Sequence, residues 1–205
     1  MSVKFTDLAR EQTMIIATEK MSFQEYLQYD DETDTLYELV DGGLIPMSLG
    51  TGKHGALAKF LERLFDDEIS KNKLSWTAQK FAVGVRSPRG RQWDTSRIPD
   101  VTVLPLEQWQ NLANREAVID FNESPPILVV EVVSSSTRKT DYRSKRTEYA
   151  VLEIPEYWIV DPDEQIVTIC TLMDRFYDAN IFQDEELIVS PTFPNLKLTP
   201  KQLFP

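Results

Sequence analysis

The stretch Ile127-Leu128-Val129-Val130-Glu131-Val132-Val133 decides the fold, because it is apolar on both faces of a β-strand. A strand with one face in water alternates apolar and polar residues, whereas a strand covered on both faces reads as an almost continuous apolar run. We therefore expect the segment 126–133 to lie inside a mixed sheet, with other elements packed against both of its faces.

Helical and extended patterns on either side of this segment complete the predicted core. Apolar residues recur at spacings of three and four between His54 and Ile69, which indicates an amphipathic helix with one core-facing stripe. The elements expected after it are strands at 76–86, 97–104 and 126–133, a loop at 109–124, a helix from Asp141 to about Glu153, and strands at 156–160 and 165–173. From His54 the order is helix, three strands, helix, strand, so the predicted fold class is α/β with a mixed sheet.

The N-terminal part is expected to add a short helix and a hairpin. Ser22-Phe23-Gln24-Glu25 is a capping box, in which the serine and the glutamate satisfy backbone groups at the start of a helix. The segment 37–45 indicates a hairpin whose turn is Asp41-Gly42-Gly43. Because the chain shows no internal repeat and no long linker, we expect a single domain over residues 1–205, with residues 1–20 as a flexible N-terminal arm.

Composition excludes several classes of protein. The 205 residues carry a net charge of −11, and Cys170 is the only cysteine, which excludes an internal disulfide framework and a cysteine-based zinc site. The longest uncharged stretch, residues 42–52, is too short and too rich in glycine for a transmembrane helix. The first residues show no apolar core of a signal peptide. We expect a cytoplasmic protein that makes no membrane contact.

Three charged residues stand where the pattern predicts apolar ones. Glu131 interrupts the most apolar run of the chain, where an unpaired carboxylate is costly or shifts its pKa. Asp100 opens another apolar strand. Lys145 shares one face of the predicted helix with Tyr142 and Tyr149, so its ammonium is expected to point toward the sheet. Together the three residues indicate a cation site formed by two carboxylates, beside a lysine that orients an attacking water.

Each of these residues also has a structural explanation. Glu131 would equally suit a buried ion pair or a strand end that reaches water. An aspartate after a proline is common at turns, which suits Asp100, and the stem of Lys145 is long enough to carry its charge to solvent. His54, at a predicted helix start, is typical of a cap or a packed residue, so we do not include it in the catalytic set.

The order of these groups resembles a known nuclease superfamily. Asp100 after Ile98-Pro99, Glu131 in the apolar strand and a lysine on the next helix resemble the PD-(D/E)XK nucleases, and the element order is similar to their restriction-endonuclease-like core. The closer resemblance is to the Uma2 (DUF820) family of endonucleases, which is abundant in cyanobacteria. The segments that carry it are Tyr37-Glu38-Leu39-Val40-Asp41-Gly42, His54, Glu131-Val132-Val133-Ser134, Thr137, Asp141, Lys145, Tyr149 and Ile154-Pro155-Glu156-Tyr157-Trp158-Ile159-Val160-Asp161.

This resemblance implies a metal-dependent DNA endonuclease. The implied catalytic residues are Asp100, Glu131, Lys145 and Glu38, and the implied metal ligands are Asp100, Glu131 and the backbone carbonyl of Val132. Oxygen ligands favour Mg²⁺ or Mn²⁺ over zinc. In the superfamily motif the lysine lies two residues after the glutamate, where this chain has Val133, so Lys145 would be a migrated lysine. Glu38 would equally suit a hairpin position that faces solvent.

Two basic segments adjoin these motifs in a chain that is acidic overall. They are candidate contacts to DNA phosphates, which supply most of the affinity of nonspecific DNA binding, although basic runs are commonly solvated surface. The predicted DNA-binding residues are Arg86, Arg89, Arg91, Arg97, Arg138, Lys139 and Arg143.

DNA and a second copy of the chain are the expected partners. Exposed aromatic residues expected in the C-terminal strands and around Trp109 favour a homodimer. Two alternatives stay open at this point. One is a catalytically inactive DNA-binding or regulatory protein on the same fold, such as an accessory factor in DNA rearrangement; the other is a structural dimer whose buried charges are paired for specificity.

Overall fold

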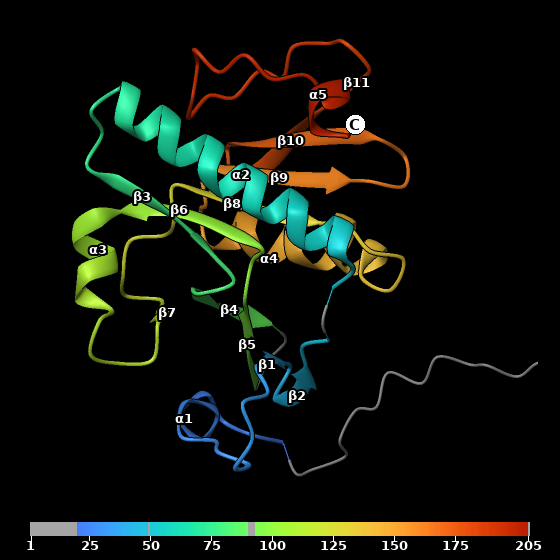
Figure 1. Ribbon diagram of the computed structural model, residues 1–205. Helices are drawn as coiled ribbons and strands as arrows, with labels where there is room; N and C mark the ends of the chain where they lie inside the picture. The colour runs from blue at the N-terminus through green and yellow to red at the C-terminus, as the bar shows by residue number, and fades with distance from the viewer. Residues whose placement is uncertain (1–19, 49, 90–92, 205) are drawn as a thin grey trace, which may run out of the picture.

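A six-stranded mixed sheet forms the centre of the computed structural model, which describes residues 20–48, 50–89 and 93–204 (Figure 1). Its strands lie in the order β11 (Phe176–Gln183), β10 (Ile166–Met173), β9 (Glu156–Asp161), β8 (Leu128–Val132), β6 (Val101–Pro105) and β3 (Trp76–Lys80). β8 runs parallel to β9 and antiparallel to β6, and all five of its residues are buried. The predicted strand inside a mixed sheet, covered on both faces, is confirmed.

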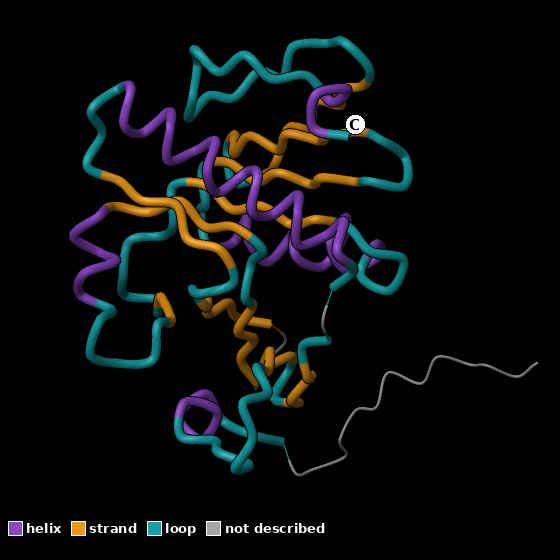
Figure 2. Tube along the Cα trace, viewed as in Figure 1, coloured by secondary structure: helices purple, strands orange, loops and turns teal. Residues whose placement is uncertain are grey.

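Helices pack against both faces of this sheet (Figures 1 and 2). α2 (Gly52–Lys71), the helix predicted from the apolar spacing, places Leu61 in the same core cluster as Val130. α4 (Arg146–Val151) covers the opposite face, where Tyr149 clusters with Val129. Because successive side chains of a strand point to opposite faces, Glu131 points toward α4 rather than toward α2.

A second, smaller sheet begins where two of the predicted strands break. Its order is β2 (Gly43–Pro46), β1 (Tyr37–Val40), β5 (Trp93–Arg97), β4 (Gly84–Arg89) and β7 (Val118–Ile119). The predicted strands 76–86 and 97–104 each divide between the two sheets, so their predicted extents are wrong. β3 ends before Phe81, whose φ of +53° does not fit a strand, and Pro99, which has no N–H to donate, separates β5 from β6.

The predicted N-terminal helix and hairpin are both confirmed. Ser22 and Glu25 form the reciprocal capping box at the start of α1 (Phe23–Leu27). β1 and β2 pair in an antiparallel register that leaves Asp41 and Gly42 as a two-residue turn. Both turn residues have positive φ, at 49° and 74°, as the tightest hairpin turns require.

The helix that follows β8 differs from the prediction in its first turns. A π-helix, η1 (Thr140–Lys145), precedes α4, where the sequence predicted a regular helix from Asp141. The hydroxyl of Tyr157 in β9 donates a hydrogen bond to the backbone carbonyl of Asp141 at 3.0 Å, so this carbonyl has a partner outside the helix. Short π-helical turns are frequent at functional sites.

The segment predicted as a loop at 109–124 contains regular structure as well. α3 (Leu106–Asn111) includes Trp109, and β7 joins the second sheet. Trp109 is half-buried and packs against the core cluster that contains Val83 and Leu104. Phe121 in the same stretch is exposed, so the expectation of exposed aromatic residues around Trp109 is confirmed for Phe121 but not for Trp109 itself.

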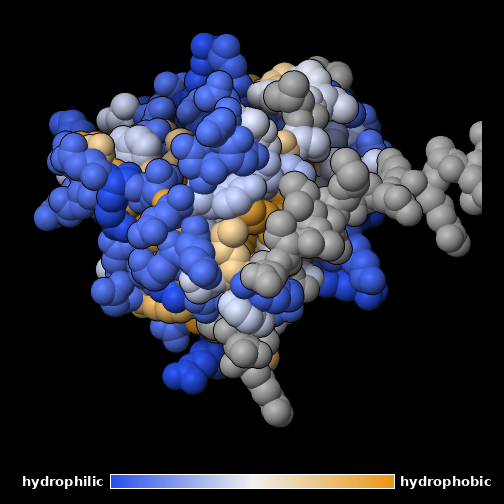
Figure 3. All heavy atoms as spheres, turned by 90° about the horizontal axis from the view of Figure 1, so that it is seen from below, coloured by the Kyte–Doolittle hydropathy of each residue, from blue (hydrophilic) through white to orange (hydrophobic). Residues whose placement is uncertain are grey.

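A short helix follows the last strands of the main sheet. α5 (Pro200–Leu203) follows β10 and β11 near the C-terminal end. No helix within the described ranges is long and apolar enough to cross a membrane. Viewed from the side of the second sheet, most of the surface is hydrophilic, with a smaller apolar area near the middle of that face (Figure 3). Residues 1–19, which include nearly all of the predicted N-terminal arm, lie outside the described residues.

Candidate active site

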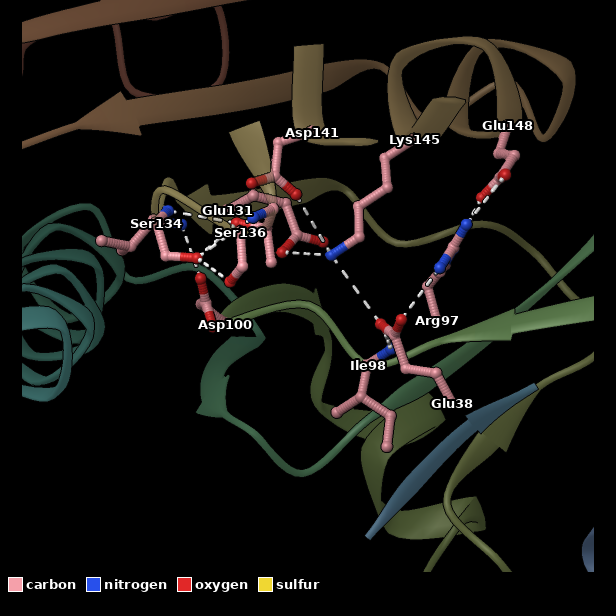
Figure 4. A network of polar contacts seen from close by, with 12 residues as sticks. Glu38, Arg97, Ile98, Asp100, Glu131, Ser134, Ser136, Asp141, Lys145 and Glu148 are labelled. Atoms are coloured by element: carbon pink, nitrogen blue, oxygen red, sulfur yellow. Dashed lines mark hydrogen bonds and ion pairs between the residues drawn. The ribbon is translucent and has the colours of Figure 1, made fainter. Parts of the chain in front are cut away.

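The four predicted catalytic side chains converge where the two sheets meet the helix after β8 (Figure 4). Asp100 lies just before β6, Glu131 lies in β8, and Lys145 ends η1. Glu38 reaches the same place from β1 of the second sheet, so the expectation of a glutamate in solvent is wrong. β6 and β8 are neighbours in the sheet, with Val101 opposite Val130, and this pairing carries Asp100 close to Glu131.

Lys145 is surrounded by carboxylates. Its Nζ lies 2.7 Å from Glu131 Oε2, 3.4 Å from Asp141 Oδ1 and 3.7 Å from Glu38 Oε1. The residue is only 5% exposed, so its charge does not reach solvent. Burial by itself lowers the pKa of Lys145, but the attraction of the three carboxylates is larger and raises the pKa above its ordinary value. Lys145 is therefore a permanently charged ammonium.

Glu131 accepts hydrogen bonds on both of its oxygens. Oε2 accepts from Lys145, and Oε1 accepts from the hydroxyl of Tyr149 at 2.6 Å. Burial raises the pKa of Glu131 well above its ordinary value, and the negative charges of Asp100 and Asp141 add to this increase against the pull of Lys145. A carboxylate in this position gains stability from any further cation.

Asp100 is held in place by two donors. The backbone N–H of Val132 donates to Oδ2 at 2.5 Å, and His54 Nε2 lies 2.9 Å from Oδ1. The hydrogen bond that His54 donates to Asp100 raises the pKa of His54, which also stacks against the ring of Phe81. His54 lies in the first turn of α2, where Thr51 caps its backbone N–H. From the sequence we did not include His54 in the catalytic set. His54 and Asp100 are 46 residues apart in the chain, and nothing in the local pattern reveals their contact.

Arg97 is a structural partner of the site rather than a DNA contact. It is 2% exposed, and it donates from Nε and Nη2 to Glu148 and from Nη1 to Glu38 at 2.9 Å. Burial raises the pKa of Glu38, but Lys145 and Arg97 outweigh it, so that the net pKa is lowered and Glu38 stays ionised. The prediction that Arg97 binds DNA is therefore corrected, because its guanidinium is enclosed by protein.

Asp141 is the other site residue that the sequence reading did not select. Its side chain is 1% exposed, and neither of its oxygens accepts a hydrogen bond within the described structure. Burial raises its pKa, while Lys145 lowers it. Its position four residues before Lys145 puts it on the face that holds the lysine, but a polar residue near a helix start is too ordinary to mark it as a site residue.

The residues present fit a divalent cation by charge and by donor type. Five buried or nearly buried carboxylates face two permanent cations: Glu38, Asp100, Glu131, Asp141 and Glu148 against Lys145 and Arg97. Carboxylate oxygens are the ligands that Mg²⁺ and Mn²⁺ prefer. Within the described ranges, however, no three carboxylate, histidine or cysteine side chains are already gathered around one point as a metal cage. Lys145 instead lies between the carboxylates.

The predicted basic surface divides into paired and exposed residues. Arg86 forms ion pairs with Asp94 and Asp120 and lies between the rings of Phe23 and Phe121. Arg138 pairs with Asp161, while Lys139 and Arg143 are exposed near the start of η1. Arg91 and the side chain of Arg89 lie outside what the structure describes. The exposed candidates for phosphate contacts are therefore Lys139 and Arg143, with Arg138 partly exposed beside them.

Comparison with known proteins identifies a family, a relative in sequence and a similar solved structure. The Uma2 family, described as "Putative restriction endonuclease", matches residues 23–201. An uncharacterized protein of Synechocystis sp. is 25% identical over 150 residues, which are 72% of this chain and 79% of that protein. The crystal structure of "a putative nuclease belonging to DUF820" from Anabaena variabilis matches with a TM-score of 0.71 and 21% identity, over 90% of this chain and 97% of that one. The predicted fold class is thereby confirmed.

Proposed function

Because the chain belongs to the Uma2 family, whose description is "Putative restriction endonuclease", we propose that it hydrolyses DNA phosphodiester bonds with the help of a divalent cation. The observation that carries this proposal is the position of Lys145. A fully charged ammonium is buried at 2.7 Å from Glu131, beside the carboxylates of Asp141 and Glu38, and Asp100 lies on the neighbouring strand.

Asp100 and Glu131 would hold the cation, with the backbone carbonyl of Val132 as a further ligand. Bound there, Mg²⁺ or Mn²⁺ would polarise the phosphate and lower the pKa of a bound water. His54 and the N–H of Val132 fix the orientation of the Asp100 carboxylate, and Tyr149 does the same for Glu131. Hydrogen-bonding partners of this kind orient metal-ligating carboxylates.

Lys145 supplies positive charge and hydrogen-bond donors rather than a base. Its raised pKa keeps the ammonium protonated, so it has no lone pair with which to accept a proton. The ammonium would orient the attacking water and offset negative charge on the phosphate as the transition state forms. The burial of Lys145 strengthens both effects, because water screens its charge only weakly.

Lys139 and Arg143 would bring the DNA backbone to this site. Both are exposed on the same turns that carry the buried Asp141 and Lys145, so they are free to contact DNA phosphates on the outer side of these turns. Arg138 would contribute only in part, because Asp161 already accepts from its guanidinium. Contacts of this kind carry no base sequence information.

Nicking of supercoiled plasmid in Mg²⁺ or Mn²⁺ tests the proposal. We expect cleavage by the wild type and a loss of about 10² or more in Asp100→Asn, because one cation ligand is then weakened. Asp161→Asn is the matched control: Asp161 is also a buried aspartate, but its oxygens accept from Arg138 and Tyr142. Cleavage by Asp100→Asn at the rate of this control would overturn the proposal. Plasmid binding without cleavage by the wild type would favour the inactive DNA-binding alternative.

A further inference from the structure

Asp141 has an unusual environment for an acidic residue. Its side chain is 1% exposed, and neither Oδ1 nor Oδ2 accepts a hydrogen bond from any residue that the structure describes. Buried carboxylates without hydrogen-bond donors are rare, because the group loses its contacts with water and gains none in exchange. The position therefore calls for a partner of positive charge.

Lys145, the cation beside Asp141, lies closer to a second carboxylate, that of Glu131. Lys145 Nζ lies 3.4 Å from Asp141 Oδ1 but only 2.7 Å from Glu131 Oε2. Figure 4 shows the carboxylates of Asp141 and Glu131 turned toward the same ammonium. One lysine thus serves two buried carboxylates, and it lies closer to Glu131 than to Asp141.

The backbone around Asp141 keeps its side chain in the site. The N–H of Asp141 donates to the carbonyl of Thr137 at 2.9 Å, and its carbonyl accepts from the hydroxyl of Tyr157 at 3.0 Å. The second contact comes from β9 and falls within the π-helical turn. These two hydrogen bonds fix the backbone of Asp141, whose side chain is buried in the site.

We infer that Asp141 is a further ligand of the divalent cation, and that Lys145 occupies the space between Asp141 and Glu131 while the protein is free of metal. This inference rests on the proposed function, because it extends the same cation site. It adds a third carboxylate to Asp100 and Glu131, and it explains why those groups are not yet gathered as a cage.

The chemistry of the ammonium and of the divalent ion supports the replacement of Lys145 by metal beside Asp141 and Glu131. An ammonium needs acceptors at about 2.7–2.9 Å, and Asp141 lies outside that range. Mg²⁺ and Mn²⁺ bind carboxylate oxygens at shorter distances and carry twice the charge, so a carboxylate without hydrogen bonds is a better ligand for them than for the lysine. Lys145 and the metal then compete for the same two side chains.

Calorimetric titration with Mn²⁺, in the absence of DNA, measures the competition. We expect Asp141→Asn to weaken Mn²⁺ binding by about tenfold or more, because a charged ligand is lost. We expect Lys145→Met to strengthen Mn²⁺ binding by a similar factor, because the competing cation is gone. Asp161→Asn, the buried control whose oxygens are already bonded, should bind Mn²⁺ as the wild type does.

A change of ligand type separates direct coordination from an effect of charge at a distance. Asp141→Cys places a soft thiolate at the position, which favours Cd²⁺ over Mn²⁺. If Asp141 is a ligand, the ratio of Cd²⁺ to Mn²⁺ affinity should rise by about tenfold or more in this variant and stay unchanged in Asp161→Cys. A variant that loses affinity for both ions to the same extent would overturn the inference, and so would Asp141→Asn with wild-type Mn²⁺ affinity.

These outcomes are separable from those of the proposed function. A wild type that binds Mn²⁺ and cleaves plasmid, with an unchanged affinity ratio in Asp141→Cys, contradicts the role of Asp141 alone. A wild type that binds neither Mn²⁺ nor Mg²⁺ contradicts the cation site itself. Thermal unfolding without metal checks that each variant is folded before titration.

Discussion

Lys145 and Arg97 divide the buried carboxylates of the site between them. Lys145 lies against Glu131 and Asp141, Arg97 lies against Glu148, and Glu38 contacts both cations. The two cations have different surroundings. The guanidinium donates to oxygens of both Glu148 and Glu38, whereas neither oxygen of Asp141, beside Lys145, accepts a hydrogen bond within the described residues.

Lys145→Met should separate catalysis from folding. Methionine has a similar length and suits a buried position, and the raised pKa of Glu131 and Asp141 lets these groups take up protons when the ammonium is absent. We therefore expect a folded protein whose cation-dependent cleavage falls by about 10² or more, since one preorganised electrostatic group is lost. Plasmid nicking and circular dichroism check the two parts. Nicking at the wild-type rate would contradict the role of Lys145.

Arg97→Met, by contrast, should destabilise the folded protein. Its removal leaves Glu38 and Glu148 buried without their guanidinium, and breaking a buried pair of this kind costs about 3–5 kcal/mol of unfolding free energy. Urea unfolding followed by tryptophan fluorescence measures this loss. An Arg97→Met protein of wild-type stability would show that Arg97 is not a structural partner.

At the scale of single residues, sequence reasoning finds those that violate a strong local pattern. Glu131 and Lys145 stand out because their neighbours on the strand and on the helix face are apolar. His54 and Asp141 do not, since a polar residue near a helix start is ordinary. Their roles depend on contacts with Asp100 and Lys145 that only the folded chain defines.

At the scale of elements, periodicity predicts what each segment is but not to which sheet it belongs. β8 and α2 follow from their apolar patterns alone. The predicted strands 76–86 and 97–104 look continuous because both parts of each are extended. The breaks at Phe81 and Pro99 redirect the chain between sheets, and that choice depends on packing rather than on local propensity.

The β1–β2 hairpin gives an element-scale prediction. Gly42 has a φ of +74°, and a Cβ there would lie 3.1 Å from the ring of Trp93, so Gly42→Ala should cost about 1–2 kcal/mol of unfolding free energy. Because this hairpin holds Glu38, cleavage should fall as well. Gly43→Ala is the matched control, since its Cβ would meet the carbonyl of Val40 at an ordinary 3.5 Å. Equal stability of the two variants in urea would contradict the assigned turn.

At the scale of the whole molecule, the site is an assembly of distant segments. Glu38 and Lys145 are more than a hundred residues apart in the chain, and the second sheet brings them within 3.7 Å. Only the resemblance to nucleases pointed to Glu38, because nothing in the local pattern of the hairpin distinguishes a residue that faces a site from one that faces water. The family match over residues 23–201 agrees with this wide distribution of site residues.

The edge of the main sheet gives a prediction about assembly. β11 is an edge strand of eight residues, on which Phe176 is 77% exposed and Ile181 is 62% exposed. Long apolar edges favour pairing with another strand, and we expect a second copy to pair there. Sedimentation at micromolar concentration should give twice the 23.6 kDa chain mass, and Ile181→Lys should shift the measured mass toward that of a single chain. Ser70→Lys on α2 is the control, and a single-chain mass for the wild type contradicts the dimer.

We propose that the buried carboxylates act through a divalent cation on DNA. The most direct test follows conversion of supercoiled plasmid to open circles by the wild type and by Glu131→Gln, first in EDTA and then across a titration of Mg²⁺. We expect no conversion in EDTA and a rate that saturates as Mg²⁺ is added. In Glu131→Gln the rate should be lower by a factor of about 10² or more at every Mg²⁺ concentration. Conversion that persists in EDTA, or equal rates for the two proteins, would contradict it.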